Sequence, residues 1–333
     1  MGNDDHRHAV ARQLAHDQDD LADQGSRPEV QLADAWPDTP GGPPSFGDRG
    51  FESRFFQQTT DGCEKKEPTM FAYRGSTAMI TGASKGLGAA FAKELAGRGT
   101  NLVLIARSID TLQDLADSLG AQYGVRCVAL QADLAKSDAV KGIVTELERL
   151  DLKIDLLINN AGLGLTGDFL SHDLAEELAG IQVNVQALVG LSHAVGAKMV
   201  SRGTGGIINL ASNSAFQPLP HMATYAAAKA FVLHFSEALK FELKGRGVQV
   251  MAVCPGPTAT SFFEGVSTKM KDGAFDTAEL VVRRTLRSFD QKKSVAYPGR
   301  FSVRVAIWLP RLLPRNVTVS AAASATGKMG LAS

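Results

Sequence analysis

The sequence has only three cysteines among its 333 residues, Cys63, Cys127 and Cys254. Their odd number and wide spacing argue against a disulfide scaffold and against a clustered zinc site. Neither sign of charge is in excess, because 35 Lys and Arg residues balance 35 Asp and Glu residues. This balance argues against a dedicated nucleic-acid binder. No apolar run approaches the roughly 20 residues that a membrane-spanning helix needs.

The first 69 residues differ from the rest in charge and composition. They hold 14 acidic and 7 basic residues, are rich in Asp, Gln, Gly and Pro, and show no hydrophobic periodicity. Such a segment cannot bury enough apolar surface to offset its ordering entropy, so we expect residues 1–69 to form a disordered tail. A regulatory or docking role for this tail is an alternative. The segment begins with acidic residues and lacks the apolar stretch of a secretory signal, so we expect a cytoplasmic protein.

Met70 offers a second interpretation of the tail. It stands a few residues before the first predicted strand, where a domain of this kind begins. The string 50–54 (Gly-Phe-Glu-Ser-Arg) can be encoded by a DNA sequence that resembles the T-arm of a transfer-RNA gene. We therefore expect translation to start at or near Met70.

From residue 75 onward, short apolar segments alternate with helical ones. Strands are expected at 76–80, 101–105, 127–130, 155–159, 206–210, 248–253 and 294–297, and helices near 88–98, 109–119, 137–150, 174–202, 224–245 and 277–289. The strands lack apolar/polar alternation, which indicates a parallel sheet covered on both faces. With right-handed crossovers, this predicts an α/β, Rossmann-like doubly wound sheet in a single domain over residues 70–300, with its ligand at the carboxyl ends of the strands.

A glycine-rich turn joins the first strand to its helix and reads Thr81-Gly82-Ala83-Ser84-Lys85-Gly86-Leu87-Gly88. Glycines let the backbone turn sharply and approach a pyrophosphate, and the following helix offers free N–H groups at its positive end. The position of this turn between a strand and a helix predicts a dinucleotide site.

The end of the second strand, Ile105-Ala106-Arg107-Ser108, carries no carboxylate. Sites that prefer NAD usually have one there to hold the ribose 2′-OH. Arg107 instead offers a forked cation that suits a 2′-phosphate, and Lys85 adds a second positive charge. We therefore expect NADP(H) rather than NAD(H), the alternative being that both are ordinary surface cations.

Tyr225 and Lys229 are four residues apart, on one face of a predicted helix. An ammonium about 4–5 Å from a phenol, at an effective dielectric near 20, is worth roughly 3–4 kcal/mol. This predicts that Lys229 lowers the pKa of Tyr225 from about 10 toward neutrality, so that Tyr225 acts as proton donor to a carbonyl or as base toward an alcohol. Ser212, just past the fifth strand, can hydrogen-bond the reacting oxygen, and Ser214 is the alternative for this role.

Residues 75 to about 265 resemble the short-chain dehydrogenase/reductase family. The motifs that carry the resemblance stand in the family's order and at its spacings. They are the glycine turn at 81–88, Asn159-Asn160-Ala161-Gly162, Ser212 with Tyr225 and Lys229, and the segment 255–260 (Pro-Gly-Pro-Thr-Ala-Thr). The resemblance does not cover the N-terminal tail and is weaker beyond about residue 270.

The resemblance implies a role for each matching residue. The catalytic residues would be Asn184, Ser212, Tyr225 and Lys229, with Asn184 holding a water in a proton relay through the lysine. Asp133 would contact adenine, Asn160 and Gly162 would back the nicotinamide ribose, and Thr258 and Thr260 would reach the carboxamide and phosphate. The full set expected to bind the cofactor is Gly82, Ser84, Lys85, Gly86, Leu87, Gly88, Arg107, Asp133, Leu134, Asn160, Ala161, Gly162, Tyr225, Lys229, Pro255, Gly256, Thr258 and Thr260.

These features predict an NADP(H)-dependent oxidoreductase that reduces a ketone or aldehyde, or oxidises the matching alcohol, without a metal. An NADP(H)-binding redox-sensing regulator with little turnover is the alternative. The substrate is expected to be apolar, such as a 3-oxoacyl, steroid-like or aromatic carbonyl compound, because apolar residues follow three of the strands. They are Leu163, Leu165, Phe216, Leu219, His221, Met222, Phe262, Phe263, Val266 and Met270, and several could instead be core or subunit contacts.

Residues 301–333 form a C-terminal extension. Its first part, 301–315, mixes apolar residues with Arg and Pro and is too short to span a bilayer. We expect it to cap the substrate pocket or to pack on a partner subunit, and peripheral contact with a membrane surface is the alternative. The end, 321–333, is expected to be frayed. The resemblance also implies a homodimer or homotetramer, paired through the helices near 174–202 and 224–245.

Overall fold

The computed structural model describes residues 71–260, 275–300, 307 and 313–331. The tail predicted over residues 1–69 lies outside the described residues, as do the pocket candidates Phe262, Phe263, Val266 and Met270. The start predicted at Met70 and most of the segment 301–315 also lie outside them.

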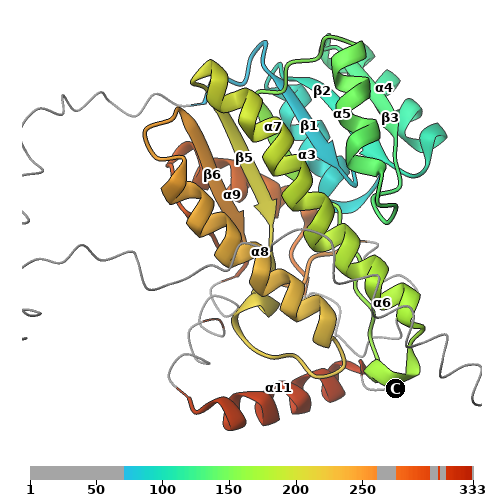
Figure 1. Cartoon of the computed structure of the whole chain (residues 1–333), viewed down its shortest axis with the longest axis vertical. Coiled ribbons are helices and arrows are strands. Elements are labelled where there is room, and N and C mark those ends of the chain that lie inside the picture. Colours follow the sequence, from blue (N-terminus) through green and yellow to red (C-terminus); the bar gives the residue numbers. More distant parts are fainter. Residues whose placement is uncertain (1–70, 261–274, 301–306, 308–312, 332–333) are drawn as a thin grey trace, which may run out of the picture. The chain divides into compact units, whose positions relative to one another are not determined.

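All seven predicted strands are present and form one parallel sheet (Figure 1). They are β1 (Thr77–Thr81), β2 (Asn101–Ala106), β3 (Cys127–Gln131), β4 (Leu156–Asn159), β5 (Gly205–Leu210), β6 (Val248–Val253) and β7 (Val295–Ala296). The strand order is β3-β2-β1-β4-β5-β6-β7. The chain therefore turns to opposite sides after β1 and after β4, and a crevice opens between their carboxyl ends. The predicted doubly wound fold is confirmed.

Helices follow the strands in turn. They are α3 (Gly86–Gly97), α4 (Ile109–Tyr123), α5 (Ala139–Arg149), α6 (Leu174–Ile181), α7 (Leu188–Arg202), α8 (Ala223–Glu242), α9 (Ala278–Asp290) and α11 (Arg315–Met329). Short 3-10 turns lie at η1 (Phe169–Ser171) and η3 (Asn213–Phe216). The long helix predicted over 174–202 is present, but a π-helical turn, η2 (Gln182–Ala187), separates α6 from α7.

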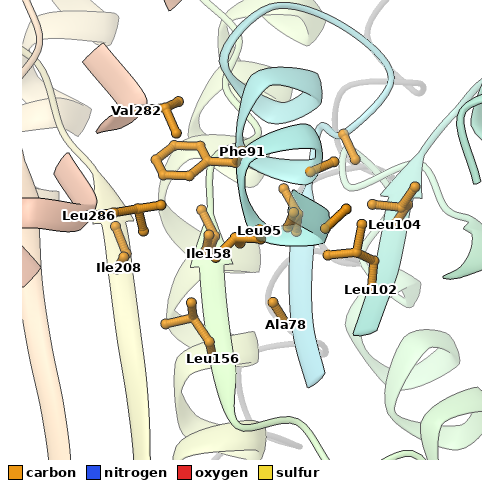
Figure 2. Packing of buried hydrophobic residues seen from close by; sticks show 14 of the residues in the cluster. Ala78, Phe91, Leu95, Leu102, Leu104, Leu156, Ile158, Ile208, Val282 and Leu286 are labelled. Carbon is orange, nitrogen blue, oxygen red and sulfur yellow. The ribbon is translucent and has the colours of Figure 1, made fainter. Parts of the chain in front are cut away.

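Both faces of the sheet are apolar, which explains why the strands show no alternation in sequence. In β1, Ile80 packs among residues of α3 and α9 on one face, whereas Met79 packs among residues of α5 and α7 on the other. Figure 2 shows Phe91 of α3 and Val282 of α9 in the first of these layers, together with Leu95, Leu102, Leu104, Leu156, Ile158, Ile208 and Leu286. Helix α8 covers the second face beside β6.

The C-terminal end differs from the prediction that residues 321–333 are frayed. Helix α11 continues to Met329 and buries a stripe of small side chains at four-residue intervals, Thr318, Ala322 and Thr326. The low hydrophobicity of this segment suggested fraying, but small side chains let a helix lie close to its support, and Ala is the strongest helix former.

The stretch Leu174–Arg202 is the one described helix that is long and apolar enough to cross a membrane by length and composition. This is weak evidence, because the core helix of a globular domain passes the same test. In this fold Leu191, Val195 and Met199 of α7 pack beneath the sheet.

Phe91 and Phe241 form a matched pair for testing this core. Phe91 is fully buried, whereas Phe241 at the end of α8 is 79% exposed. We expect Phe91→Ala to lower the free energy of unfolding by about 3–5 kcal/mol, because it leaves a cavity on the face of the sheet that α3 and α9 cover. Phe241→Ala should change it by no more than about 0.5 kcal/mol. Urea unfolding followed by circular dichroism measures both, and equal effects would contradict this assignment of the core.

Candidate active site

One cavity of about 670 Å³ lies at the carboxyl ends of the strands. It gathers nearly all of the sequence-predicted site residues from segments far apart in the chain. The predicted residues that line it are Gly82, Ser84, Lys85, Gly86, Leu87, Arg107, Asp133, Leu134, Asn160, Ala161, Gly162, Ser212, Tyr225, Lys229, Pro255, Gly256, Thr258 and Thr260. Gly88 and Asn184 do not line the cavity and lie directly behind it.

The glycine turn brings the backbone of α3 close to β1. Gly82 and Gly86 have φ of +64° and +58°, a conformation that side chains rarely adopt. A Cβ on Gly88 would lie 2.1 Å from the carbonyl oxygen of Gly82, so this glycine serves helix packing rather than direct ligand contact. Lys85, Gly86 and Leu87 at the start of α3 line the cavity. The positive end of the helix therefore faces the cavity, where it suits a pyrophosphate.

Thr81 and Asn160 tie the glycine turn to the turn after β4. The hydroxyl of Thr81 accepts hydrogen bonds from the backbone N–H groups of Asn160 and Ala161, both at 3.0 Å. The side-chain Nδ2 of Asn160 donates to the carbonyl oxygens of Thr81 (2.9 Å) and Gly82 (3.2 Å). Asn160 therefore shapes the cavity wall, and Thr81 supports it from behind. From the sequence, Thr81 was recognised only as part of the glycine motif, and this supporting role was not predicted.

The cation predicted to select the cofactor stands at the end of β2. Arg107 is exposed on the cavity wall, and its carbonyl oxygen accepts a hydrogen bond from Gln131 (2.8 Å). Ser108 and Thr111 line the cavity beside it and were not predicted. Asp133 lines the cavity while its carboxylate caps a turn, since Oδ1 accepts from the N–H of Ala135 (3.1 Å).

Ser212, Tyr225 and Lys229 meet at the carboxyl end of β5. The Tyr225 side chain is hydrogen-bonded to that of Ser212. Lys229 is buried, its Nζ donates to the carbonyl oxygen of Leu210 (2.8 Å), and it lies 5.6 Å from the centroid of the Tyr225 ring. The arrangement follows from sequence, because an i, i+4 pair on α8 shares one helix face and α8 packs on β6 and η3.

The pKa of Tyr225 departs from the prediction that Lys229 brings it toward neutrality. Burial raises the pKa of Tyr225 to about 12, and the hydrogen bond from Ser212 only partly opposes this. Burial also lowers the pKa of Lys229 to about 8. Desolvation disfavours the phenolate and the ammonium alike. The sequence does not show how deeply the two side chains are buried, so the prediction did not account for the size of this effect. Tyr225 is therefore held as a neutral phenol, the form that donates a proton.

The two candidate serines have different surroundings. The Ser212 hydroxyl accepts from the backbone N–H of Ser214 (3.2 Å), donates to Asn213 Oδ1 (3.2 Å) and is hydrogen-bonded to Tyr225. The Ser214 hydroxyl is buried and has no hydrogen-bond partner among the described residues. This geometry favours Ser212 over Ser214 as the partner of Tyr225.

Asn184 lies on the π-helical turn behind Lys229. Its Nδ2 donates to the carbonyl oxygens of Leu163 (2.6 Å) and Gly180 (2.9 Å). Its buried Oδ1 has no partner among the described residues. A Cβ on Gly162 would lie 3.0 Å from this Oδ1 and 3.4 Å from Lys229 Nζ. A side chain at position 162 would therefore crowd both groups, and the glycine lets the backbone pass close to Asn184 and Lys229.

Buried amides beneath the site join α7, β4, β5 and α8. Asn159 Nδ2 donates to Ser192 Oγ (3.0 Å) and to Asn209 Oδ1 (2.9 Å). Asn209 Nδ2 in turn donates to Ser236 Oγ (3.0 Å). Buried polar groups of this kind stabilise one relative placement of the elements that carry them, because any shift leaves them unpaired.

The apolar residues predicted for the pocket divide into two groups. Leu163, Leu219 and Met222 line the cavity, whereas Leu165, Phe216 and His221 do not. The ring of Phe216 packs on Tyr297 at 5.9 Å between centroids, and His221 Nδ1 lies 3.0 Å from Asp168 Oδ1. Four cavity residues from the end of the chain were not predicted, because that segment was expected to be frayed; they are Ala325, Thr326, Met329 and Leu331.

Known proteins are similar to this chain in sequence. Residues 76–271 match the model of the short chain dehydrogenase family. The mouse (Mus musculus) 17-beta-hydroxysteroid dehydrogenase type 3 is 33% identical over 228 residues, 68% of this chain and 72% of that protein.

Solved structures are similar too. A short-chain dehydrogenase from Sphingobium yanoikuyae in complex with NADPH is 35% identical, with a TM-score of 0.65 over 71% of this chain and 93% of that one. A bulky-bulky ketone specific alcohol dehydrogenase from Comamonas testosteroni is 34% identical, with a TM-score of 0.63 over 71% of this chain and 91% of that one. With its parallel sheet, glycine turn and Ser-Tyr-Lys site, the chain belongs to the short-chain dehydrogenase/reductase family of oxidoreductases.

Proposed function

We propose that this chain is an NADP(H)-dependent reductase of apolar ketones. The observation that carries the proposal is the hydrogen-bonded pair of Ser212 and Tyr225, with the buried Lys229 behind it, in the same cavity as the glycine turn. A proton donor is needed for turnover and not for sensing, so this geometry favours an enzyme over a redox-sensing regulator.

NADP(H) fits the residues at the dinucleotide end of the cavity. The N-terminus of α3 would hold the pyrophosphate, and Arg107 with Lys85 would meet a 2′-phosphate. The similar dehydrogenase from Sphingobium yanoikuyae was solved with NADPH, which supports the same choice. When bound, this cofactor supplies or takes up the hydride.

The side chains of this chain handle the proton and the charge on the substrate oxygen. Ser212 Oγ donates a hydrogen bond to the carbonyl oxygen of the substrate and stabilises the negative charge that develops on that oxygen. Tyr225, held as a neutral phenol, transfers its proton to that oxygen. The ammonium of Lys229 stabilises the phenolate left behind. The buried Oδ1 of Asn184, which has no partner among the described residues, would accept a hydrogen bond from a water that restores the proton.

The substrate class follows from the cavity beyond Ser212. Leu163, Leu219 and Met222 give it an apolar surface. Two similar proteins carry names that refer to hydroxysteroids and to bulky ketones, which supports a large apolar carbonyl compound as substrate. The cell usually keeps NADP reduced, so reduction is the proposed direction.

Substitution of Tyr225 tests the proposed function directly. We expect Tyr225→Phe to lower kcat for reduction of 2-acetylnaphthalene by about 10²–10⁴-fold, because the proton donor is lost, while NADPH binding by fluorescence is retained. Ser212→Ala should lower kcat by about 10²-fold or more, whereas Ser214→Ala should keep most of it. Full activity of Tyr225→Phe, or equal losses in both serine variants, would refute the assignment.

Arg107 is expected to discriminate between the two cofactors. Arg107→Ala should raise KM for NADPH by about 10–100-fold and leave KM for NADH nearly unchanged, since a charge-assisted contact to phosphate contributes about 1.5–3 kcal/mol. Arg126→Ala is the matched control, because Arg126 is exposed just before β3, at the opposite end of the sheet. Steady-state kinetics with both cofactors measures the effect, and equal losses with NADPH and NADH would contradict it.

The pH dependence of reduction should report Lys229. With a pKa of about 12, Tyr225 stays protonated across the usual range, whereas Lys229, with a pKa of about 8, loses its charge first. We therefore expect kcat/KM for reduction to fall as the pH rises above about 8. In Lys229→Arg, whose cation does not titrate, the remaining activity should not fall over this range. A decline of the same shape in both proteins would assign it to another group.

A further inference from the structure

The last described helix forms one side of the cavity. Ala325, Thr326, Met329 and Leu331 line the same space as Ser212 and Tyr225, although about 100 residues separate them in sequence. In Figure 1, α11 lies at the end of the fold, beyond the N-terminal end of α8. Its stripe of small side chains, Thr318, Ala322 and Thr326, is at most 6% exposed, so the helix is packed along this face.

The end of α11 turns the chain back into the cavity. Gly330 has φ of +78° and its N–H donates to the carbonyl oxygen of Gly327 (3.1 Å). The N–H of Leu331 donates to the carbonyl oxygen of Thr326 (3.0 Å). These two bonds form a Schellman motif, in which the residue after the glycine makes an apolar contact. Leu331 is accordingly only 5% exposed and lines the cavity.

Helix α11 presents no free polar side chain to the cavity. The Thr326 hydroxyl donates within its own helix, to the carbonyl oxygens of Ala322 (3.1 Å) and Ala323 (3.0 Å). The remaining side-chain surface of the four lining residues is hydrocarbon and thioether. A charged substrate group placed here would lose its hydration without gaining a partner.

The cavity surface contributed by the β5–α8 loop is held in place. Leu219 and Met222 line the cavity in this loop, and His221 stands between them with φ of +64°. The carbonyl oxygen of His221 accepts from the N–H of Gly167 (3.0 Å), and its ring pairs with Asp168. The loop is thus tied to the segment after β4.

We infer that the end of α11, through Met329 and Leu331, is the wall that selects the substrate by size and polarity. It accepts a large uncharged apolar group on the carbonyl carbon and rejects a charged one. The identity of the reacting carbonyl rests on the proposed function. Contact between the wall and the apolar group of the substrate concerns binding, which can be measured without turnover.

Two substitutions change the space beside this wall in opposite directions. Leu331→Trp fills the space and should raise KM for 2-acetylnaphthalene at least about tenfold, with little change for butan-2-one. Met329→Ala enlarges the space and should improve kcat/KM for 2-acetylanthracene relative to 2-acetylnaphthalene. Val317→Ala is the matched control, because Val317 is on the same helix and 46% exposed.

Wild-type protein should reduce 2-acetylnaphthalene at least about 100-fold better than the carboxylate 6-acetyl-2-naphthoate.

A binding measurement separates failure of this inference from failure of the proposed function. In a Tyr225→Phe background with NADPH present, 2-acetylnaphthalene binding is measured by calorimetry, without and with Leu331→Trp. Loss of binding with Leu331→Trp and not with Val317→Ala supports the wall even if no ketone is turned over. Equal binding in all three proteins, no binding in any, or equal KM changes for small and large ketones would overturn the wall, and circular dichroism shows that each variant is folded.

Discussion

The hydrogen bonds between Asn159, Asn209 and their serine partners fix the geometry on which the site depends. They join β4 and β5 to α7 and α8, which cover the same face of the sheet, in the interior where an unpaired amide group is costly. Helix α8 carries Tyr225 and Lys229, and β5 leads directly to Ser212. A shift of α8 along the sheet would therefore break the hydrogen bond to Ser236 and also separate the hydroxyls of Ser212 and Tyr225. The buried hydrogen bonds of Asn159 and Asn209 thus stabilise the packing of the helices on the sheet and keep these two hydroxyls close together.

Desolvation is the second constraint on this site. It raises the pKa of Tyr225 and lowers that of Lys229, so burial by itself favours two neutral groups. The hydroxyl of Ser212 and the carbonyl of Leu210 supply the hydrogen bonds that these buried groups need. In the proposed reaction, Tyr225 is a neutral phenol at rest and a charged phenolate after it gives up its proton. Burial favours the first form, and the ammonium of Lys229 would stabilise the second.

The sequence predicted the sheet, and it named Ser212, Tyr225 and Lys229 as residues that meet in one cavity, because both follow from local pattern. Apolar strands between helices indicate a parallel sheet, and the four-residue spacing of Tyr225 and Lys229 fixes their shared face. The pKa of Tyr225 could not be predicted, since it depends on burial set by distant segments. The same holds for α11, whose Ala- and Ser-rich sequence resembles a frayed end until a surface is present to bury Thr318, Ala322 and Thr326. Gly88 was predicted to bind the cofactor, whereas in the structure it lies against the backbone of Gly82 and lets α3 pack closely on β1.

The π-helical turn between α6 and α7 sets the phase of one long helix. Such a turn contains one residue more than an α-helical turn, and each residue of an α-helix advances about 100° around the axis. The wide turn absorbs this extra residue, so α6 and α7 keep the relative rotation that they would have on a regular helix one residue shorter. Winding Gln182–Ala187 as regular α-helix without removing a residue would rotate α6 by about that angle relative to α7. Glu177 would then no longer face His172, whose Nδ1 lies 2.7 Å from its Oε1, or the core face of α7 would leave the sheet. The π-helical turn thus lets one long helix meet both sets of contacts at once.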